Sequence, residues 1–276
     1  MKLINLCFLC VIAIALFALE MNATENNGNC RQDLTEALLK YGNNPKKWNP
    51  LNYAIEMKDY TAALSLIDFI DDINIIDSGK YPLDRLCNNI FIDKNITDNQ
   101  EELLLILLLR EGKNSYGIST KGLIFHTAAL HGCSFSFIET LLGLDIDLHE
   151  KNGYPFLGAV GSGNISLVQH LLCMKIDLNR IHGLLNTAVS TGNLELVVYF
   201  WEELGQRPYR PWGNPLYVAI IYRYFEVFKY LLEVGVNPND PQSLLKIALE
   251  LPELTKDDQN YKIQIVEMLL KYGAKY

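Results

Sequence analysis

The chain has 276 residues, of which 49% are hydrophobic and 20% charged, so it holds enough apolar side chains to bury a core and is not a disordered chain. Its net charge is −8, from 24 basic and 32 acidic residues, and no basic block occurs. Because a nucleic-acid binder needs clustered lysine and arginine to neutralise phosphates, we expect no nucleic-acid partner.

Residues 1–23 match the pattern of a secretory signal peptide. The amino terminus is positive, and residues 6–19 (LCFLCVIAIALFAL) carry no charge. Cleavage could follow Ala18 or Ala23. The alternative is an uncleaved membrane anchor, because Leu3–Leu19 is near the lower length limit of a bilayer-spanning helix. Both interpretations export the rest of the chain, to the periplasm, the medium or an endomembrane lumen according to the organism.

The segment after this leader has two parts, a polar stretch and a predicted helix. Residues 24–33 are polar and predict a flexible lead-in. Leu34–Gly42 (LTEALLKYG) then predicts a lone helix, with Asp33 or Thr35 as its N-cap. We expect this helix to be an N-terminal half-repeat, because the ends of a stack of repeats must be capped.

A pattern with a period near thirty residues fills the remaining chain. Seven segments share a Pro or apolar residue, an apolar residue, two variable positions and then an alanine, which is leucine in one segment. These anchor residues are Ala54, Leu86, Ala128, Ala159, Ala188, Ala219 and Ala248. They lie 29 to 32 residues apart except for one interval of 42, which contains the polar stretch 88–100. Self-similarity at this period is typical of stacked helical repeats.

A second pattern follows the anchors. Gly132, Gly163 and Gly192 each lie four residues after their alanine, where glycine suits the turn that ends a short helix. An amphipathic stretch that ends in paired apolar residues comes next, as in 167–172 (LVQHLL) and 227–232 (VFKYLL). Each unit is therefore predicted to contain a short helix, a tight turn, a longer helix and a loop.

This unit resembles the ankyrin repeat. The phrases at 163–168 (GNISLV), 192–197 (GNLELV) and 231–239 (LLEVGVNPN) are similar to that family's consensus. The resemblance extends over residues 34–276, in about seven repeats with an insertion at 88–100, and implies an all-α solenoid of helix-turn-helix repeats. The family's Thr-Pro-Leu-His start is only partly kept and the intervals are mostly shorter than 33 residues, so we expect shortened finger loops and less regular stacking.

One helix of the second repeat is apolar throughout. Residues 103–109 (LLLILLL) are too few to span a bilayer, and a helix that is apolar on all sides must be buried on all sides. We expect residues 90–96 (IFIDKNI) of the insertion to cover it. The alternative is an exposed helix that binds lipid or a partner.

The sequence contains no recognisable enzyme motif: GxSxG, Walker A, HExxH and GxGxxG are all absent. His126 and His131 are five residues apart and diverge around a helix, so they are not placed as metal ligands. We therefore expect a protein without catalysis, metal or cofactor.

The cysteines favour a structural role. Cys87, Cys133 and Cys173 are predicted to be small buried hydrophobic side chains. Cys30, in the lead-in, could be a reactive or intermolecular thiol.

The ankyrin resemblance implies a protein partner, bound on a concave face made of finger loops and inner helices, and we expect a monomer. A membrane contact would require that the N-terminal segment stays uncleaved. The candidate partner-binding residues are Trp48, Tyr81, His131, Tyr154, Thr191, Trp212 and Tyr222. The alternative for the finger aromatics is that they pack on neighbouring fingers and replace the missing Thr and His contacts.

Overall fold

The computed structural model describes residues 28–209, 213–239, 243–252 and 255–276, with the backbone alone for 28–32. The predicted signal peptide and Trp212 lie outside the described residues. The chain divides into two compact units, Met1–Ile146 and Asp147–Tyr276. Within the described ranges the secondary structure is helical, without a β-strand and with an isolated bridge between Asp77 and Lys80.

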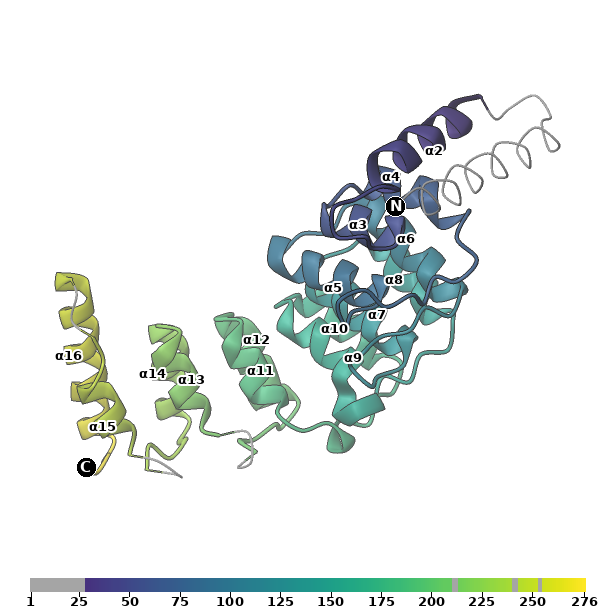
Figure 1. The fold of residues 1–276 in the computed structure, drawn as a ribbon. Helices are drawn as coiled ribbons and strands as arrows, with labels where there is room; N and C mark the ends of the chain where they lie inside the picture. Colours follow the sequence, from purple (N-terminus) through teal and green to yellow (C-terminus); the bar gives the residue numbers. More distant parts are fainter. Residues whose placement is uncertain (1–27, 210–212, 240–242, 253–254) are drawn as a thin grey trace. The chain divides into compact units, whose positions relative to one another are not determined.

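The first unit contains α2 (Gly28–Tyr41) followed by three pairs of helices (Figure 1). The pairs are α3 (Pro50–Glu56) with α4 (Tyr60–Ile67), α5 (Pro82–Asp93) with α6 (Asp98–Leu109), and α7 (Thr120–Leu130) with α8 (Phe135–Leu142). We call the first member of each pair the inner helix and the second the outer helix. Inner helices pack on inner helices, α3 on α5 and α5 on α7, while the outer helix α4 packs on α6.

The lone helix α2 packs on α4 and α3, as predicted for a helix that covers the first pair. It buries Leu34, Ala37 and Tyr41, which recur on one face at helical spacing. Its start differs from the prediction, because the helix begins at Gly28. Residues 28–33 of the predicted lead-in are therefore helical, and Asp33 and Thr35 lie inside the helix and do not cap it.

The second unit contains four pairs in its described residues (Figure 1). They are α9 (Glu150–Gly161) with α10 (Ile165–Leu172), α11 (Leu184–Ser190) with α12 (Leu194–Val198), α13 (Pro215–Ile221) with α14 (Phe225–Glu233), and α15 (Leu244–Leu249) with α16 (Lys256–Lys271). A 3₁₀ turn, η1 (Leu178–Arg180), precedes α11, and α12 continues into one π-helical turn, η2 (Tyr199–Glu203). The inner helices α9, α11, α13 and α15 pack in succession.

The anchor residues lie in the buried core of each helix pair. All seven have 0% exposed surface, including Leu86, which takes the alanine position in α5. A small side chain at this point lets neighbouring inner helices approach closely, which explains the repeated alanine. The sequence pattern thus identified the buried side of every inner helix.

The turn after each inner helix requires a left-handed backbone. Gly132, Gly163 and Gly192 have φ between +71° and +73°, which confirms the predicted glycine turns. At the same place, four residues after their anchors, Lys58 (φ +59°) and Arg223 (φ +63°) adopt this conformation without glycine.

The 42-residue interval arises from two longer helices, because the inner helix α5 exceeds α3 and the outer helix α6, with 12 residues, exceeds α4, with 8. α5 has 12 residues where α3 has 7, and it ends at Lys94 in the left-handed region, with φ +58°. The predicted insertion, 88–100, is divided between the last turns of α5, a short loop and the start of α6.

The prediction that α6 is buried on all sides was wrong. The helix α6 packs on α4, α5 and α7. Its residues Leu103, Leu104, Leu107 and Leu108 are buried, but Leu109 is 65% exposed. From the insertion, Ile90 is buried, whereas Phe91 and Ile92 point to solvent. The packing of α4, α5 and α7 therefore buries part of the surface of α6, and the exposed Phe91 and Ile92 of the insertion do not cover the rest.

Asparagine side chains connect a repeat to the next finger loop, by which we mean the segment between an outer helix and the following inner helix. The Asn52 amide donates to Ile75 O (2.9 Å), and the Asn214 amide donates to Asn237 O (2.8 Å). Asn152 and His182 exchange two bonds, from Asn152 Nδ2 to His182 O and from His182 N to Asn152 Oδ1. Asparagine therefore makes cross-repeat contacts where the family's Thr and His are missing.

No helix in the described ranges combines the length and the apolar character that crossing a bilayer requires.

Candidate protein-binding surface

Trp48, the first predicted finger residue, is held within the first unit. The Arg85 guanidinium lies 3.9 Å from the centre of its ring, and Lys46 Nζ lies 4.1 Å from it. Arg85 is itself buried and donates to Glu56 Oε2 (2.7 Å) and to Asp77 O. Trp48 therefore has the contacts expected if a finger ring packs against its own repeats.

Tyr81 and Tyr154 are half-buried. Tyr81 is the N-cap of α5, and its backbone N–H donates a hydrogen bond to Asp84 Oδ2 (3.1 Å). Tyr154 lies in α9, directly after three residues with left-handed backbone, Lys151 to Gly153. Both rings are positioned by helix starts and present only part of their surface to solvent.

His131 and Thr191 end the inner helices α7 and α11 and are also half-buried. The His131 ring meets the Phe91 ring edge-on, with centroids 5.8 Å apart, and burial lowers the pKa of His131. Thr191 Oγ1 donates to Ala188 O (2.7 Å) and accepts from Asn193 N (3.1 Å). Both side chains have partners within the chain, and each keeps some exposed surface beside its turn.

Tyr209, a neighbour of the undescribed Trp212 in the same finger, shows a second packed finger ring. It stacks on His182 of the preceding finger, with centroids 4.2 Å apart and planes 13° apart. Finger aromatics thus make cross-repeat contacts in both units.

Tyr222 differs from the other candidates, because it is 59% exposed. Its ring stacks on Tyr224, with centroids 5.9 Å apart and planes 12° apart. Tyr224 is itself held by the preceding repeat: its ring lies over Gly192, and its hydroxyl donates to Ser190 O (3.4 Å). An exposed aromatic ring is therefore fixed on a supporting ring before any partner arrives.

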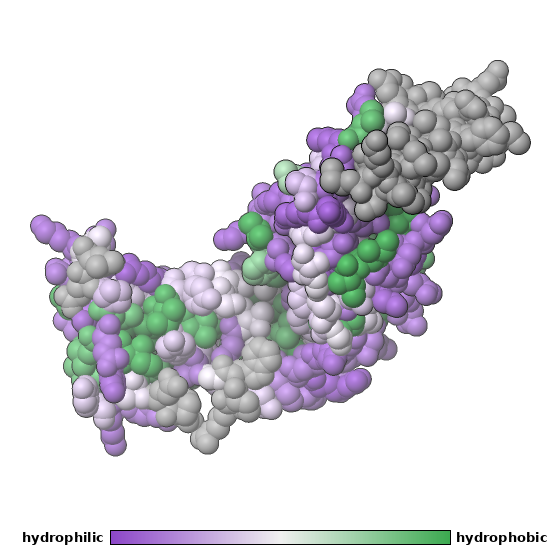
Figure 2. Space-filling view, in the orientation of Figure 1, coloured by the Kyte–Doolittle hydropathy of each residue, from purple (hydrophilic) through white to green (hydrophobic). Residues whose placement is uncertain are grey.

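Three further exposed residues accompany Tyr222 on the adjacent inner helices α13 and α15. We define the inner-helix patch as Tyr217 (42% exposed), Ile221 (45%), Tyr222 (59%) and Leu249 (43%). Tyr217 and Ile221 are four residues apart, so they share one face of α13. Figure 2 shows hydrophobic side chains on the visible face over the region of α13 to α16. Grouped exposed apolar and aromatic residues are typical of interaction surfaces.

Of the patch residues, Tyr222 was a candidate from the sequence, whereas Tyr217 and Leu249 were not. Tyr217 lies two residues before its anchor, and at that position Asn52 and Asn186 are buried. The pattern therefore gave no signal that a side chain there would face solvent.

Arg223 lies next to the patch and is paired. Its guanidinium donates to Asp258 Oδ1 and lies 5.5 Å from the centre of the Tyr261 ring. The hydrogen bond from Arg223, followed by that from Thr255, lowers the pKa of Asp258 below its ordinary value of 3.8. Burial raises the pKa of Tyr261 to about 12. The ion pair at the edge of the patch therefore adds no net charge to it.

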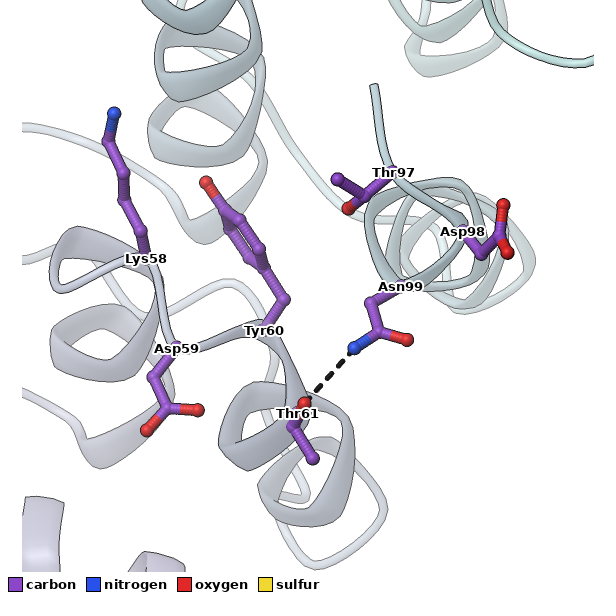
Figure 3. Close-up of a pocket in the computed structure, with 7 residues that line it drawn as sticks. All are labelled: Lys58, Asp59, Tyr60, Thr61, Thr97, Asp98 and Asn99. Carbon is purple, nitrogen blue, oxygen red and sulfur yellow. Dashed lines mark hydrogen bonds between the residues drawn. The ribbon is translucent and has the colours of Figure 1, made fainter. Parts of the chain in front are cut away.

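An open pocket of ≈ 440 Å³ lies between the starts of α4 and α6 (Figure 3). Several of its polar groups are paired within the chain, since Asp59 accepts from Lys40 Nζ (2.7 Å) and Tyr41 Oη (2.7 Å), and Asn99 donates to Thr61 (3.0 Å). Burial opposes ionisation of Asp59, but these hydrogen bonds keep the pKa of its carboxyl below 3.8. We assign this pocket to the packing of α2, α4 and α6.

The described residues contain no cluster of three or more His, Cys, Asp or Glu side chains that could hold a metal ion. Cys87 is buried, and burial raises its pKa to about 12, as predicted for a structural thiol. Cys133 is half-buried, and burial likewise raises its pKa to about 12. The prediction for Cys173 was wrong: it is exposed, because it caps the end of α10 at the surface.

Comparison with known proteins supports the repeat assignment. Residues 156–242 match the family model described as ankyrin repeats (3 copies). No match was found among curated proteins. A solved structure, the crystal structure of the human ASB11 ankyrin repeat domain, is similar with a TM-score of 0.43 and 19% sequence identity, over 83% of this chain and 85% of that one. With the family match and the helix pairs together, the all-α ankyrin-repeat fold predicted from the sequence is confirmed.

Proposed function

We propose that this chain is an exported, non-catalytic ankyrin-repeat protein that binds another protein through the inner-helix patch. Ankyrin repeats generally mediate protein–protein interactions, and residues 156–242, which match them, include most of the patch. The observation that supports the proposal most is the exposure of Tyr217, Ile221, Tyr222 and Leu249 on helices whose anchor residues are fully buried.

Binding would depend on a surface that is already ordered. Tyr222 is held by Tyr224, and Tyr224 is held by the turn at Gly192, so little side-chain freedom remains to be lost on association. Aromatic side chains offer a large contact area with few rotatable bonds, which suits a central contact residue. No proton transfer or bond breaking is required of the patch.

Capture of the partner from intact host cells tests the surface. A Tyr222→Ala/Ile221→Ala variant should retain less than about a tenth of the partner captured by the wild-type chain, because central contacts of this kind are worth ~2 kcal/mol or more. Leu270→Ala is the matched control, since Leu270 is 56% exposed on the outer helix α16 and should leave capture unchanged. Equal capture by the wild type and the patch variant, with helical circular dichroism intact, would disprove the site.

Export rests on the sequence of residues 1–23 and is tested separately. The alternative is a membrane-tethered scaffold that retains Leu3–Leu19. N-terminal sequencing of the exported protein distinguishes the two: a start at Leu19 or Thr24 excludes the anchor, and a start at Met1 in the membrane fraction excludes the cleaved leader.

A further inference from the structure

His149 connects two successive finger loops of the second unit through its ring. It precedes α9, and its Nε2 accepts a hydrogen bond from the backbone N–H of Asp177, 3.0 Å away in the next finger. Its Nδ1 lies 3.5 Å from Asp147 Oδ1, and its side chain is 18% exposed. The ring is therefore enclosed between its own turn and the following finger.

This bond exists in one protonation state of the ring. Nε2 can accept only when it bears no hydrogen, so the neutral ring carries its hydrogen on Nδ1, toward Asp147. A protonated imidazole bears hydrogen on both nitrogens, so the Nε2–H and the Asp177 N–H would face each other as two donors. Histidine is the side chain that ordinarily changes charge between pH 5 and 8.

The charged groups around the ring come from both fingers. On its own turn, Asp147 accepts from His149 N (2.9 Å), and its Oδ1 lies 3.5 Å from Nδ1 of the ring. On the next finger, the Asp177 carboxylate accepts from Asn179 N and Nδ2, both at 3.1 Å, and caps η1. The carboxylate of Asp177 is thus engaged, and its backbone N–H is the group that meets the ring.

The chain contains the same arrangement without a titratable group. Asn239 donates its backbone N–H to Asn237 Oδ1 (2.9 Å), as His149 does to Asp147, and its Oδ1 accepts from the N–H of Lys275 (2.7 Å). Lys275 and Asp177 each follow the outer helix of the repeat. An amide oxygen accepts a hydrogen bond at every pH between 5 and 8. The Asn239 contact is therefore an internal reference for the His149 contact.

We propose that His149 makes the contact between the finger loops before α9 and before α11 dependent on pH: the neutral ring holds the Asp177 amide, and the protonated ring releases it. The reciprocal contacts of Asn152 with His182 remain, so release is confined to the start of the second finger. In mildly acidic surroundings this finger becomes free at one end while the helices stay folded.

Amide hydrogen exchange followed by NMR on the full chain tests this. From about pH 7.5 to about pH 5, the protection of the Asp177 amide, corrected for intrinsic exchange, should fall about fivefold, whereas that of the Lys275 amide should not change. The His149→Asn variant should lose the pH dependence at Asp177. The Asn239→His variant should gain one at Lys275.

Two outcomes would overturn the proposal. The first is equal protection of the Asp177 amide at both pH values in the wild type. The second is a pH dependence at Asp177 that persists in His149→Asn, which would assign the effect to another group, such as the ring of His182 stacked on Tyr209.

Discussion

The turn between inner and outer helix is built in two ways. At Gly163 and Gly192 the left-handed turn is occupied by glycine, and the next repeat packs directly against it. At Lys58 and Arg223 the same backbone conformation is adopted by long basic side chains, which reach an aspartate further along the chain, Asp93 and Asp258 respectively.

The difference shows that one backbone conformation permits two kinds of contact between repeats. A Cβ added at Gly192 would lie 2.6 Å from the Tyr224 ring, so glycine there is required by both the backbone and the packing. At Lys58 and Arg223 the strain of a non-glycine residue is accompanied by an ion pair that glycine could not make.

The largest effect is expected from Gly192→Ala. The new Cβ would overlap the Tyr224 ring and would also strain a turn with φ +71°, so unfolding in urea should show a loss of about 2–4 kcal/mol. Gly132→Ala is the control at the same place in its repeat, with φ +73° and no atom within 4 Å, and should lose about 1–2 kcal/mol from strain alone. Equal losses in the two variants would mean that Tyr224 does not pack on the turn.

A smaller effect is expected from changing one kind of turn into the other. Arg223→Ala removes the ion pair and keeps the backbone strain, whereas Arg223→Gly removes both. Arg223→Gly should therefore be more stable than Arg223→Ala by about 1 kcal/mol in urea unfolding. If Arg223→Gly is the less stable variant, the turn at Arg223 is not strained and the comparison with Gly192 fails.

The smallest effect concerns the titration of Asp258. Its folded pKa lies below the ordinary 3.8, so its ionised form stabilises the fold above that pH, and this contribution is lost as the pH falls through the folded pKa. In Arg223→Ala, carboxyl ¹³C NMR should show the pKa of Asp258 rising toward 3.8, while Thr255 still donates to the carboxylate. An unchanged titration would show that the ion pair does not form in solution.

The repeated pattern was predictable from the sequence because its causes are local. Each anchor alanine is buried for the same reason in every repeat, and the glycines four residues later adopt the turn that only glycine takes without strain. These positions needed no knowledge of distant partners.

The departures could not be predicted, because each depends on a residue far along the chain. Nothing near Trp48 in the sequence indicates that Arg85 lies over its ring, and nothing near Arg223 indicates that Asp258 meets it. The exposure of Leu109 has a similar cause, since only the packing of α4, α5 and α7 decides which sides of α6 remain open. For the candidate site, Tyr222 was predictable from its place after the anchor, whereas Tyr217 was not.

Hydrogen–deuterium exchange of the chain with and without its captured partner tests the proposed binding surface most directly. If the inner-helix patch is the contact, exchange should slow in α13 and α15, around Tyr217, Tyr222 and Leu249, and remain unchanged in the outer helices α14 and α16. Slowed exchange confined to α14 and α16, with α13 and α15 unaffected, would contradict the account.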